Sequence, residues 1–333
     1  MSKKIAVIFT GGTICCETVQ DGTRRPHAET MGYQLLDTYR EQHPEQEFSV
    51  DMPMNMLSED FTPFAWNLLL EALRRVAGNE VCGVIIAHGT DSLAETAAML
   101  SVALLGYRLP VILVSAHSPL TDQRTNGHVN FAAAVQLLQQ EIPHGVWVVY
   151  QNPEDVVYVH QGAHLRACAN ESDSFFSRDM QPISTFVPPK QKKTHEIASP
   201  LFSMSLFSKT DSVLLIRPYI GQRYDRMDLE GIAAIIHGTY HSETANSQYD
   251  SPYSVRYLIK EAKKNEIPVF LAPCNAVRQQ YGSAADLVEA GAVPLTDASV
   301  QLAYGAASVG ISLGYRGTAL YEWVSVVCEL FAD

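Results

Sequence analysis

The sequence predicts an α/β protein with a larger N-terminal and a smaller C-terminal α/β domain, each built on a mainly parallel sheet. Three observations carry this prediction. Short Val- and Ile-rich runs bounded by turn residues recur along the chain, as at 5–9 and 83–87, and such continuous apolar runs are typical of parallel strands covered on both faces. Helix-like segments alternate with these runs, which is the pattern of α/β folds. A polar, proline-bearing stretch near 188–209 separates the two halves.

The first half of the chain, residues 1–187, is expected to form a five-stranded sheet. After the first strand, a polar stretch at 17–29 shows no apolar periodicity, so it is either a loop that covers a site or a plain surface loop. The elements are expected in this order: a strand at 5–9, a helix at 31–42, a strand at 47–52, a helix at 63–77, a strand at 83–87, a helix at 92–105, and strands at 110–115 and 146–150.

The second half resumes the alternation after an expected linker at 188–209, whose polar, basic and proline-bearing sequence suits an exposed connection. Residues 210–333 are expected to form the smaller domain. Its expected elements are strands at 212–216, 233–237 and 268–272, and helices at 252–265, 283–289 and 299–313.

Composition narrows the class of protein. With 333 residues the chain is long enough for two domains, and its net charge of −12 argues against nucleic acid or an anionic membrane as the main partner. No run approaches the roughly eighteen apolar residues of a membrane-spanning helix. The six cysteines show no CxxC spacing and the first residues show no signal-peptide pattern. Reduced thiols and a cytoplasmic location are therefore expected.

Two threonine-bearing loops are the strongest functional signal. Thr10-Gly11-Gly12-Thr13 directly follows the strand at 5–9, and His88-Gly89-Thr90-Asp91 directly follows the strand at 83–87. Ligands of open α/β sheets bind at the carboxyl ends of the strands, so both threonines are expected at one edge. Two threonines and an aspartate there suggest nucleophilic chemistry on a carbonyl group. A tight turn with an uninvolved threonine and a plain helix cap remain the alternatives.

The start of the following helix supports this interpretation. Ser92-Leu93-Ala94-Glu95 has the pattern of a capping box, which leaves the hydroxyl of Thr90 free to face a crevice. The helix dipole at this end favours a bound carboxylate. No cofactor is expected, because the first loop lacks the third glycine of GxGxxG and no GxxxxGK[ST] motif occurs.

Other motifs are weaker. The pairs His160/His164 and His237/His241 lack the helical context of zinc hydrolases, so they are interpreted as surface or hydrogen-bonding histidines. Ser308 lies in a near match to the GxSxG motif, but an apolar helical pattern surrounds it. A packed helix serine is therefore favoured over an esterase nucleophile.

The combination of TGGTI, Leu57-Ser58-Glu59-Asp60 and HGTD, in this order, resembles the bacterial-type L-asparaginases. The lack of an export signal is similar to their cytoplasmic, type I-like branch. The resemblance implies hydrolysis of L-asparagine to L-aspartate and ammonia, with a small amino-acid amide as the binding partner and no metal. It also implies a homodimer or homotetramer.

The resemblance further implies a role for each motif residue. Thr13 would attack the side-chain amide as the nucleophile, while Thr90 and Asp91 would move protons and hold the substrate. Residues 14–32 contain no tyrosine, which the family's loop normally supplies to activate the nucleophile. Arg166 stands where the family has a lysine beside the aspartate. A buried Asp91–Arg166 ion pair is therefore expected, without the proton relay that a lysine provides.

Substrate binding is implied for residues of all three motifs. Ser58 would bind the α-carboxylate, and Glu59 together with Asp91 would bind the α-ammonium group, which is good charge complementarity. Gly12 and Gly89 would contribute through their backbone, because N–H groups beside the two threonines can stabilise an oxyanion.

Two classes of function stay open. The first is an amidohydrolase that releases ammonia from asparagine or a related amide. The second is an asparaginase-fold protein that binds or senses an amino acid with little turnover, which the missing tyrosine and lysine motivate. The preferred amide is not fixed by the sequence, because one methylene group is discriminated only weakly by the shape of a pocket.

Overall fold

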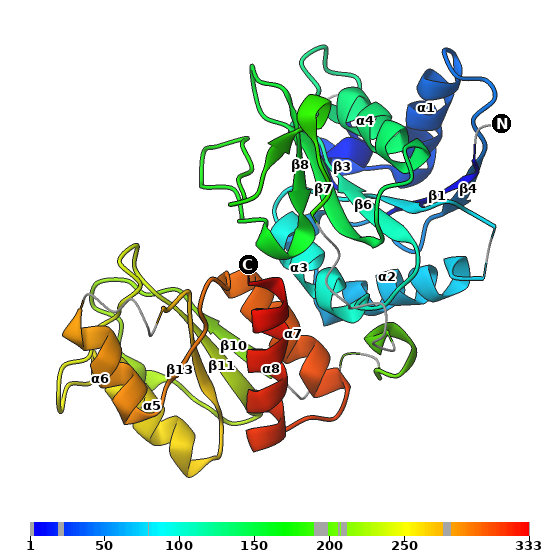
Figure 1. The fold of residues 1–333 in the computed structure, drawn as a ribbon. Coiled ribbons are helices and arrows are strands. Elements are labelled where there is room, and N and C mark those ends of the chain that lie inside the picture. Colours follow the sequence, from blue (N-terminus) through cyan, green and yellow to red (C-terminus); the bar gives the residue numbers. More distant parts are fainter. Residues whose placement is uncertain are drawn as a thin grey trace. The chain divides into compact units, whose positions relative to one another are not determined.

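A computed structural model of the chain describes residues 3–18, 23–78, 80–189, 199–205, 207, 212–275 and 281–332. The chain divides into two units, Met1–Ser203 and Met204–Asp333. In each unit helices cover both faces of a mainly parallel sheet (Figure 1), which confirms the predicted fold class. The expected linker at 188–209 falls partly outside the described residues, so its boundaries stay predictions.

The first unit is built on a seven-stranded sheet. Its strands are β1 (Ile5–Phe9), β4 (Phe48–Asp51), β5 (Val84–Ala87), β6 (Pro110–Val114), β7 (Gly145–Gln151), β8 (Val157–Gln161) and β9 (Gln181–Pro182). Their order along the sheet is β4-β1-β5-β6-β7-β8-β9. Pairs from β4 to β7 are parallel, whereas β8 and β9 are antiparallel additions. All five predicted strands are present and adjacent.

Helices cover this sheet on both sides. They are α1 (Ala28–Arg40), α2 (Pro63–Val76), α3 (Leu93–Ala103) and α4 (Gly127–Gln139), with short turns η1 (Thr13–Cys15), η2 (Ser58–Asp60), η3 (Gly162–His164), η4 (Ile183–Thr185) and η6 (Pro200–Phe202). Helices α1 and α4 lie on one face, and α2 and α3 on the other (Figure 1). Helix α3 is buried at every position except Glu95, because its Ala- and Leu-rich sequence is apolar around its circumference.

The polar stretch after β1 is more regular than predicted. It forms an antiparallel pair of strands, β2 (Cys16–Thr18) and β3 (Arg24–Pro26), while residues 19–22 lie outside the described part. The N–H of His27 donates to the Cys15 carbonyl at 2.7 Å, which fixes the returning strand beside η1. The absence of apolar periodicity was therefore wrongly interpreted as absence of structure, because backbone pairing holds these exposed residues.

The second unit carries a four-stranded parallel sheet in the order β10-β11-β12-β13. Its elements are β10 (Ser212–Ile216), η7 (Tyr224–Arg226), β11 (Ile232–Gly238), α5 (Val255–Lys264), β12 (Val269–Ala272), α6 (Gly282–Ala290), β13 (Val293–Pro294), α7 (Val300–Ser312) and α8 (Gly317–Phe331). Helices α5 and α6 cover one face, and α7 and α8 the other (Figure 1).

Two further expectations can be compared with the structure. The six cysteines are all free, and four of them are buried, which agrees with the prediction of reduced thiols. No helix among the described residues has both the length and the hydropathy that crossing a bilayer requires.

Candidate active site

A sharp turn directly after β1 holds Thr13. Gly11 and Gly12 have φ angles of 109° and 70°, in the left-handed region that side-chain-bearing residues avoid. The turn is attached to a neighbouring segment, because Gly12 N donates to the Met56 carbonyl at 2.9 Å and Met56 N donates to the Thr10 carbonyl at 3.0 Å. Thr13 then begins η1 with its side chain half-buried.

The second threonine loop, at 88–91, lies beside this turn. Strands β1 and β5 are parallel neighbours, so the loops that follow them emerge at the same edge of the sheet. A Cβ atom on Gly12 would overlap the backbone of Gly89, which shows how closely the two loops approach. Thr90 is half-buried and Asp91 is exposed. The structure thus brings the two loops together, as the strand pattern predicts.

Ser58 reaches the same place from η2 and is buried. Its Oγ accepts a hydrogen bond from Asp91 N at 3.1 Å, and its carbonyl accepts one from Ser92 Oγ at 2.7 Å. A Cβ atom on Gly89 would overlap the Ser58 side chain. Ser92 is the N-cap of α3, but its side chain makes no capping hydrogen bond. The predicted capping box is therefore wrong, because the Ser92 hydroxyl bonds to Ser58 instead.

The residues 10–13, 58–60 and 88–91 are called the three-loop cluster below. Three exposed acids, Glu59, Asp60 and Asp91, lie on it. Glu59 and Asp91 each have a cysteine nearby. Burial, with smaller contributions from carboxylates that include Asp91, raises the pKa of Cys168 to about 12, and burial with a smaller contribution from Glu59 raises the pKa of Cys16 to about 11. Both thiols stay protonated at neutral pH, so neither supplies a thiolate nucleophile.

Arg166 does not form the predicted buried ion pair. Both Arg166 and Asp91 are exposed, and no ion pair joins them within the described residues. The N–H of Arg166 donates to the Phe176 carbonyl at 3.0 Å, which pairs this segment with its neighbour while the guanidinium stays in water. An exposed guanidinium avoids the desolvation cost that a buried ion pair must recover. Cys168, two residues later, lies near Asp91 instead.

The other motif residues have structural partners. His160 Nδ1 bonds to Ser177 Oγ and His164 Nδ1 bonds to Asp179 Oδ2, each at 2.9 Å, so these are hydrogen-bonding histidines as predicted. Ser308 Oγ donates to the carbonyl four residues earlier in α7 at 2.8 Å, which confirms the packed helix serine.

His88, the first residue of the HGTD motif, also belongs to the three-loop cluster, although the sequence did not predict a role for it. It is fully buried, and its Nδ1 lies 2.8 Å from the Gly89 carbonyl oxygen. Its ring packs edge-on against Phe61 with the centroids 4.8 Å apart. Burial lowers the pKa of His88 to about 4, so the imidazole is neutral at neutral pH. The signal in the sequence was its position directly after a buried strand.

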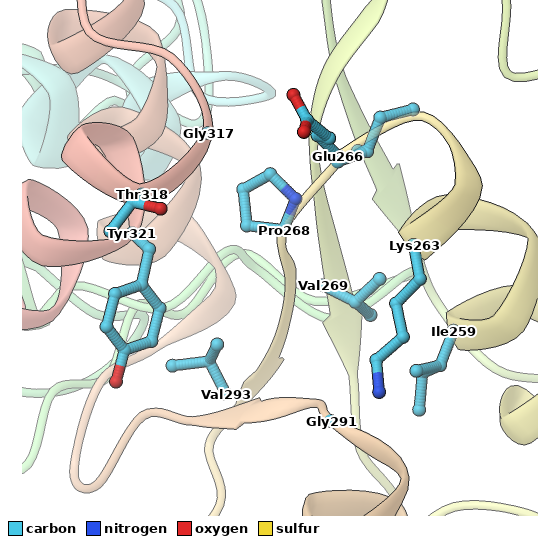
Figure 2. Close-up of a pocket in the computed structure, with 11 residues that line it drawn as sticks. Ile259, Lys263, Glu266, Pro268, Val269, Gly291, Val293, Gly317, Thr318 and Tyr321 are labelled. Atoms are coloured by element: carbon cyan, nitrogen blue, oxygen red, sulfur yellow. The ribbon is translucent and has the colours of Figure 1, made fainter.

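A separate cavity of about 390 Å³ lies within the second unit. Figure 2 shows Pro268, Val269 and Val293 along its wall, with the side chain of Lys263 extending from α5. Pro268 and Val269 mark the amino end of β12, whereas α/β sheets bind ligands at the carboxyl ends of their strands. No residue of the three-loop cluster lines this cavity. The three-loop cluster is therefore the candidate active site.

Comparison with known sequences supports a family assignment. Residues 4–199 match the family model described as "Asparaginase, N-terminal". A glutamyl-tRNA(Gln) amidotransferase subunit of Methanococcus maripaludis is 28% identical over 196 residues, which are 58% of this chain and 46% of that protein. The corresponding protein of Saccharolobus solfataricus is 24% identical over 320 residues, covering 88% of this chain and 68% of that protein. The chain spans about half the length of the first of these relatives.

Solved structures share the fold over both units. The thermostable L-asparaginase of Thermococcus kodakarensis has a TM-score of 0.72 at 20% identity, covering 98% of this chain and 97% of that one. L-asparaginase I of Vibrio cholerae has a TM-score of 0.72 at 22% identity, with 97% of each chain covered. Because the family model matches more than half of the residues of this chain, the chain belongs to the asparaginase family.

Proposed function

We propose that this protein is an amidohydrolase that converts L-asparagine to L-aspartate and ammonia, with Thr13 as the nucleophile. The observation that supports the proposal is the three-loop cluster itself. A threonine hydroxyl group on a glycine turn, a second threonine hydroxyl group, backbone N–H groups and three exposed acids belong to loops that lie together at one sheet edge. These are the parts that acyl transfer from an amide requires.

The substrate is held through its amino-acid end. Ser58 Oγ accepts from Asp91 N, which leaves the hydroxyl hydrogen available to the substrate α-carboxylate. The α-ammonium group binds between two exposed acids, Glu59, which follows Ser58 in the chain, and Asp91, whose N–H donates to Ser58 Oγ. The side-chain amide then extends toward Thr13, because the turn that carries Thr13 contacts the loop that carries Asp91.

The chemistry proceeds in two steps. Thr13 Oγ forms a bond to the amide carbon, and backbone N–H groups of the two threonine loops stabilise the oxyanion that results. With no tyrosine in residues 14–32, Thr90 and Asp91 take the proton from Thr13 and deliver it to the leaving nitrogen. Loss of ammonia leaves an ester on Thr13. Water then attacks this ester, releases L-aspartate and restores the hydroxyl group.

The names of the similar proteins define the range of substrates to test. One set names an amidotransferase and the other names L-asparaginases. We place asparagine first, because the L-asparaginase of Vibrio cholerae corresponds to this chain over 97% of both lengths, whereas the match to the Methanococcus amidotransferase protein covers 46% of that protein.

The test is an ammonia-release assay on the purified chain with L-asparagine, L-glutamine and D-asparagine. We expect L-asparagine to give the highest kcat/KM of the three amides. Faster release from glutamine would keep the amidohydrolase and change its substrate. No ammonia from any of the three, at saturating concentration and neutral pH, would contradict the proposed function.

A second candidate is an asparaginase-fold protein that binds or senses an amino acid with little turnover. Two observations favour it, namely the absence of a tyrosine in residues 14–32 and the absence, within the described residues, of an ion pair between Asp91 and Arg166. Calorimetric titration with L-asparagine distinguishes the two candidates. Saturable binding without ammonia release would support the binding protein, and binding with release would support the enzyme.

A further inference from the structure

We propose that His88 is a positioning residue that fixes the orientation of the Gly89–Thr90 peptide, so that the Thr90 N–H serves as a donor to the oxyanion. The inference rests on the proposed function. It assigns a task to a buried, uncharged side chain that does not itself touch the substrate.

The acceptor fixes the direction of the hydrogen bond made by His88. His88 Nδ1 lies 2.8 Å from the Gly89 carbonyl oxygen, which can only accept. Nδ1 therefore carries the hydrogen, and Nε2 of the neutral ring is bare. Within the described structure Nε2 has no hydrogen-bond partner, so the ring's one polar contact holds the carbonyl of the adjacent peptide.

The geometry of the Gly89–Thr90 peptide then sets the direction of its N–H group. A trans peptide is planar, so its N–H points opposite to its carbonyl. With the Gly89 carbonyl turned toward the buried imidazole, the Thr90 N–H is directed away from it. This N–H makes no hydrogen bond within the described residues, whereas the next one, Asp91 N, is used by Ser58 Oγ. A pre-aimed N–H without a protein partner is what a developing oxyanion needs.

The Gly89–Thr90 peptide requires a restraint to keep this orientation. Gly89 lacks a Cβ atom, and glycine allows rotations of its flanking peptides that other residues forbid. Glycine is nevertheless required here, because a Cβ atom would overlap the Ser58 side chain. The imidazole is itself immobile, since His88 N donates to the Val114 carbonyl at 2.9 Å and the ring packs against Phe61. A fixed ring therefore restrains a flexible peptide.

The same local arrangement occurs once more among the described residues, at the carboxyl end of β11. His237 Nδ1 lies 2.6 Å from the Gly238 carbonyl, and its Nε2 lies 2.7 Å from the Tyr224 hydroxyl. There the hydroxyl group of the following threonine has a protein partner, because Thr239 Oγ1 donates to the Pro273 carbonyl at 2.7 Å. The histidine-to-carbonyl bond is thus a feature of the His-Gly-Thr turn, and a purely structural role is the interpretation that the experiment must separate from positioning.

The experiment compares kcat and KM for asparagine hydrolysis in wild type and variants. His88→Phe keeps a ring but removes the donor, and we expect kcat to fall about a hundredfold with KM within about twofold, because an oxyanion contact exists only in the transition state. His88→Asn keeps a donor at the δ position and His88→Gln moves it to the ε position, so kcat should be higher in the Asn variant. This pair answers the question if His88→Phe does not fold.

The matched control is His160→Phe. His160 is also fully buried, bonds through Nδ1 to Ser177 Oγ and has no partner for Nε2 within the described residues. It lies on β8, three strands from β5. We expect its thermal midpoint to fall as in His88→Phe while kcat is retained. Wild-type kcat in His88→Phe, or equal kcat in the Asn and Gln variants, would overturn the positioning role.

Failure of the proposed function gives a different result. If the wild type releases no ammonia, the proposed function is wrong, and the crystal structure of His88→Phe then decides the positioning claim. A rotated Gly89–Thr90 peptide would support it, and an unchanged peptide would overturn it.

Discussion

At the scale of single residues, two glycines determine how closely the two threonine loops approach each other. Gly12 and Gly89 allow two loops to approach to backbone contact, and Ser58 fills the space beside them. A larger side chain at either glycine would separate Thr13 from Thr90. Exposed side chains lack this packing. Asp91 and Arg166 are both exposed, and no ion pair joins them within the described residues.

The lowered pKa values of three buried histidines predict how the free energy of unfolding depends on pH. Burial lowers the pKa of His88, His160 and His237 to about 4, from 6.5 in an exposed side chain. Below pH 6.5 the unfolded chain binds protons that the folded chain does not, so the free energy of unfolding falls as the pH drops toward 4. The loss is up to about 1.4 kcal/mol per pH unit for each histidine. Above pH 6.5 this contribution is fully present.

Thermal unfolding between pH 7 and pH 5 measures this effect. We expect the midpoint to fall steadily over that interval, and to fall less steeply in His160→Phe, which has one fewer buried imidazole. A midpoint that is constant from pH 7 to pH 5 in the wild type would contradict the lowered pKa values.

At the scale of elements, the contact between loops can be tested by adding one methyl group. Gly89→Ala places a Cβ atom into the Ser58 side chain, so we expect kcat/KM to fall at least tenfold and the thermal midpoint to drop. Gly78→Ala is the matched control, because a Cβ there has no neighbour within 4 Å. Equal activity of the two variants would show that the close approach at Gly89 is not needed.

The hairpin of β2 and β3 remains a candidate lid. Its strands pair beside η1, and Arg24 Nη1 lies 3.5 Å from the His117 carbonyl, just beyond the end of β6. Closing lids exclude water and complete active sites. We expect amide hydrogen exchange at 17–29 to slow when saturating L-aspartate is added. The same exchange rates with and without the ligand would leave the hairpin as an ordinary surface feature.

The sequence predicted the elements whose apolar residues follow a regular pattern along the chain. Buried parallel strands such as β1 and β5 were recognisable as short Val- and Ile-rich runs between turn residues. Helices α4 and α8 were missed. Helix α4 is apolar over much of its surface and so has no clear helical period. Helix α8 does have one, because its buried residues recur at helical spacing, but its β-branched and aromatic residues hid it: Leu320, Val324, Val327 and Cys328. The hairpin was missed because its residues are mostly exposed.

The proximity of the two threonine loops could be predicted from the sequence, whereas the contacts between the loops could not. Strand order placed both threonine loops at one edge, but the Ser92-to-Ser58 bond joins segments 34 residues apart and replaced the expected cap. The exposure of Arg166 could not be predicted, because an irregular segment has no periodicity to show which side faces water. His88 stood in the motif, yet its bond to Gly89 depends on ring burial that only the fold provides.

At the scale of the whole molecule, two α/β units in one chain reproduce the fold of L-asparaginases over nearly their full length. The resemblance of the sequence to that family predicts a homodimer or homotetramer. Sedimentation velocity at micromolar concentration should therefore give a mass of two or four chains. A species of one chain that retains full amidase activity would contradict the predicted assembly.

The central claim is that the three-loop cluster hydrolyses an amide through the hydroxyl group of Thr13. Ammonia release from L-asparagine by Thr13→Ala, measured beside the wild type, tests it most directly. We predict that kcat falls by at least about a thousandfold while the thermal midpoint stays within a few degrees, because a nucleophile is lost from a half-buried position without opening the core. Wild-type turnover by a folded Thr13→Ala chain would contradict the account.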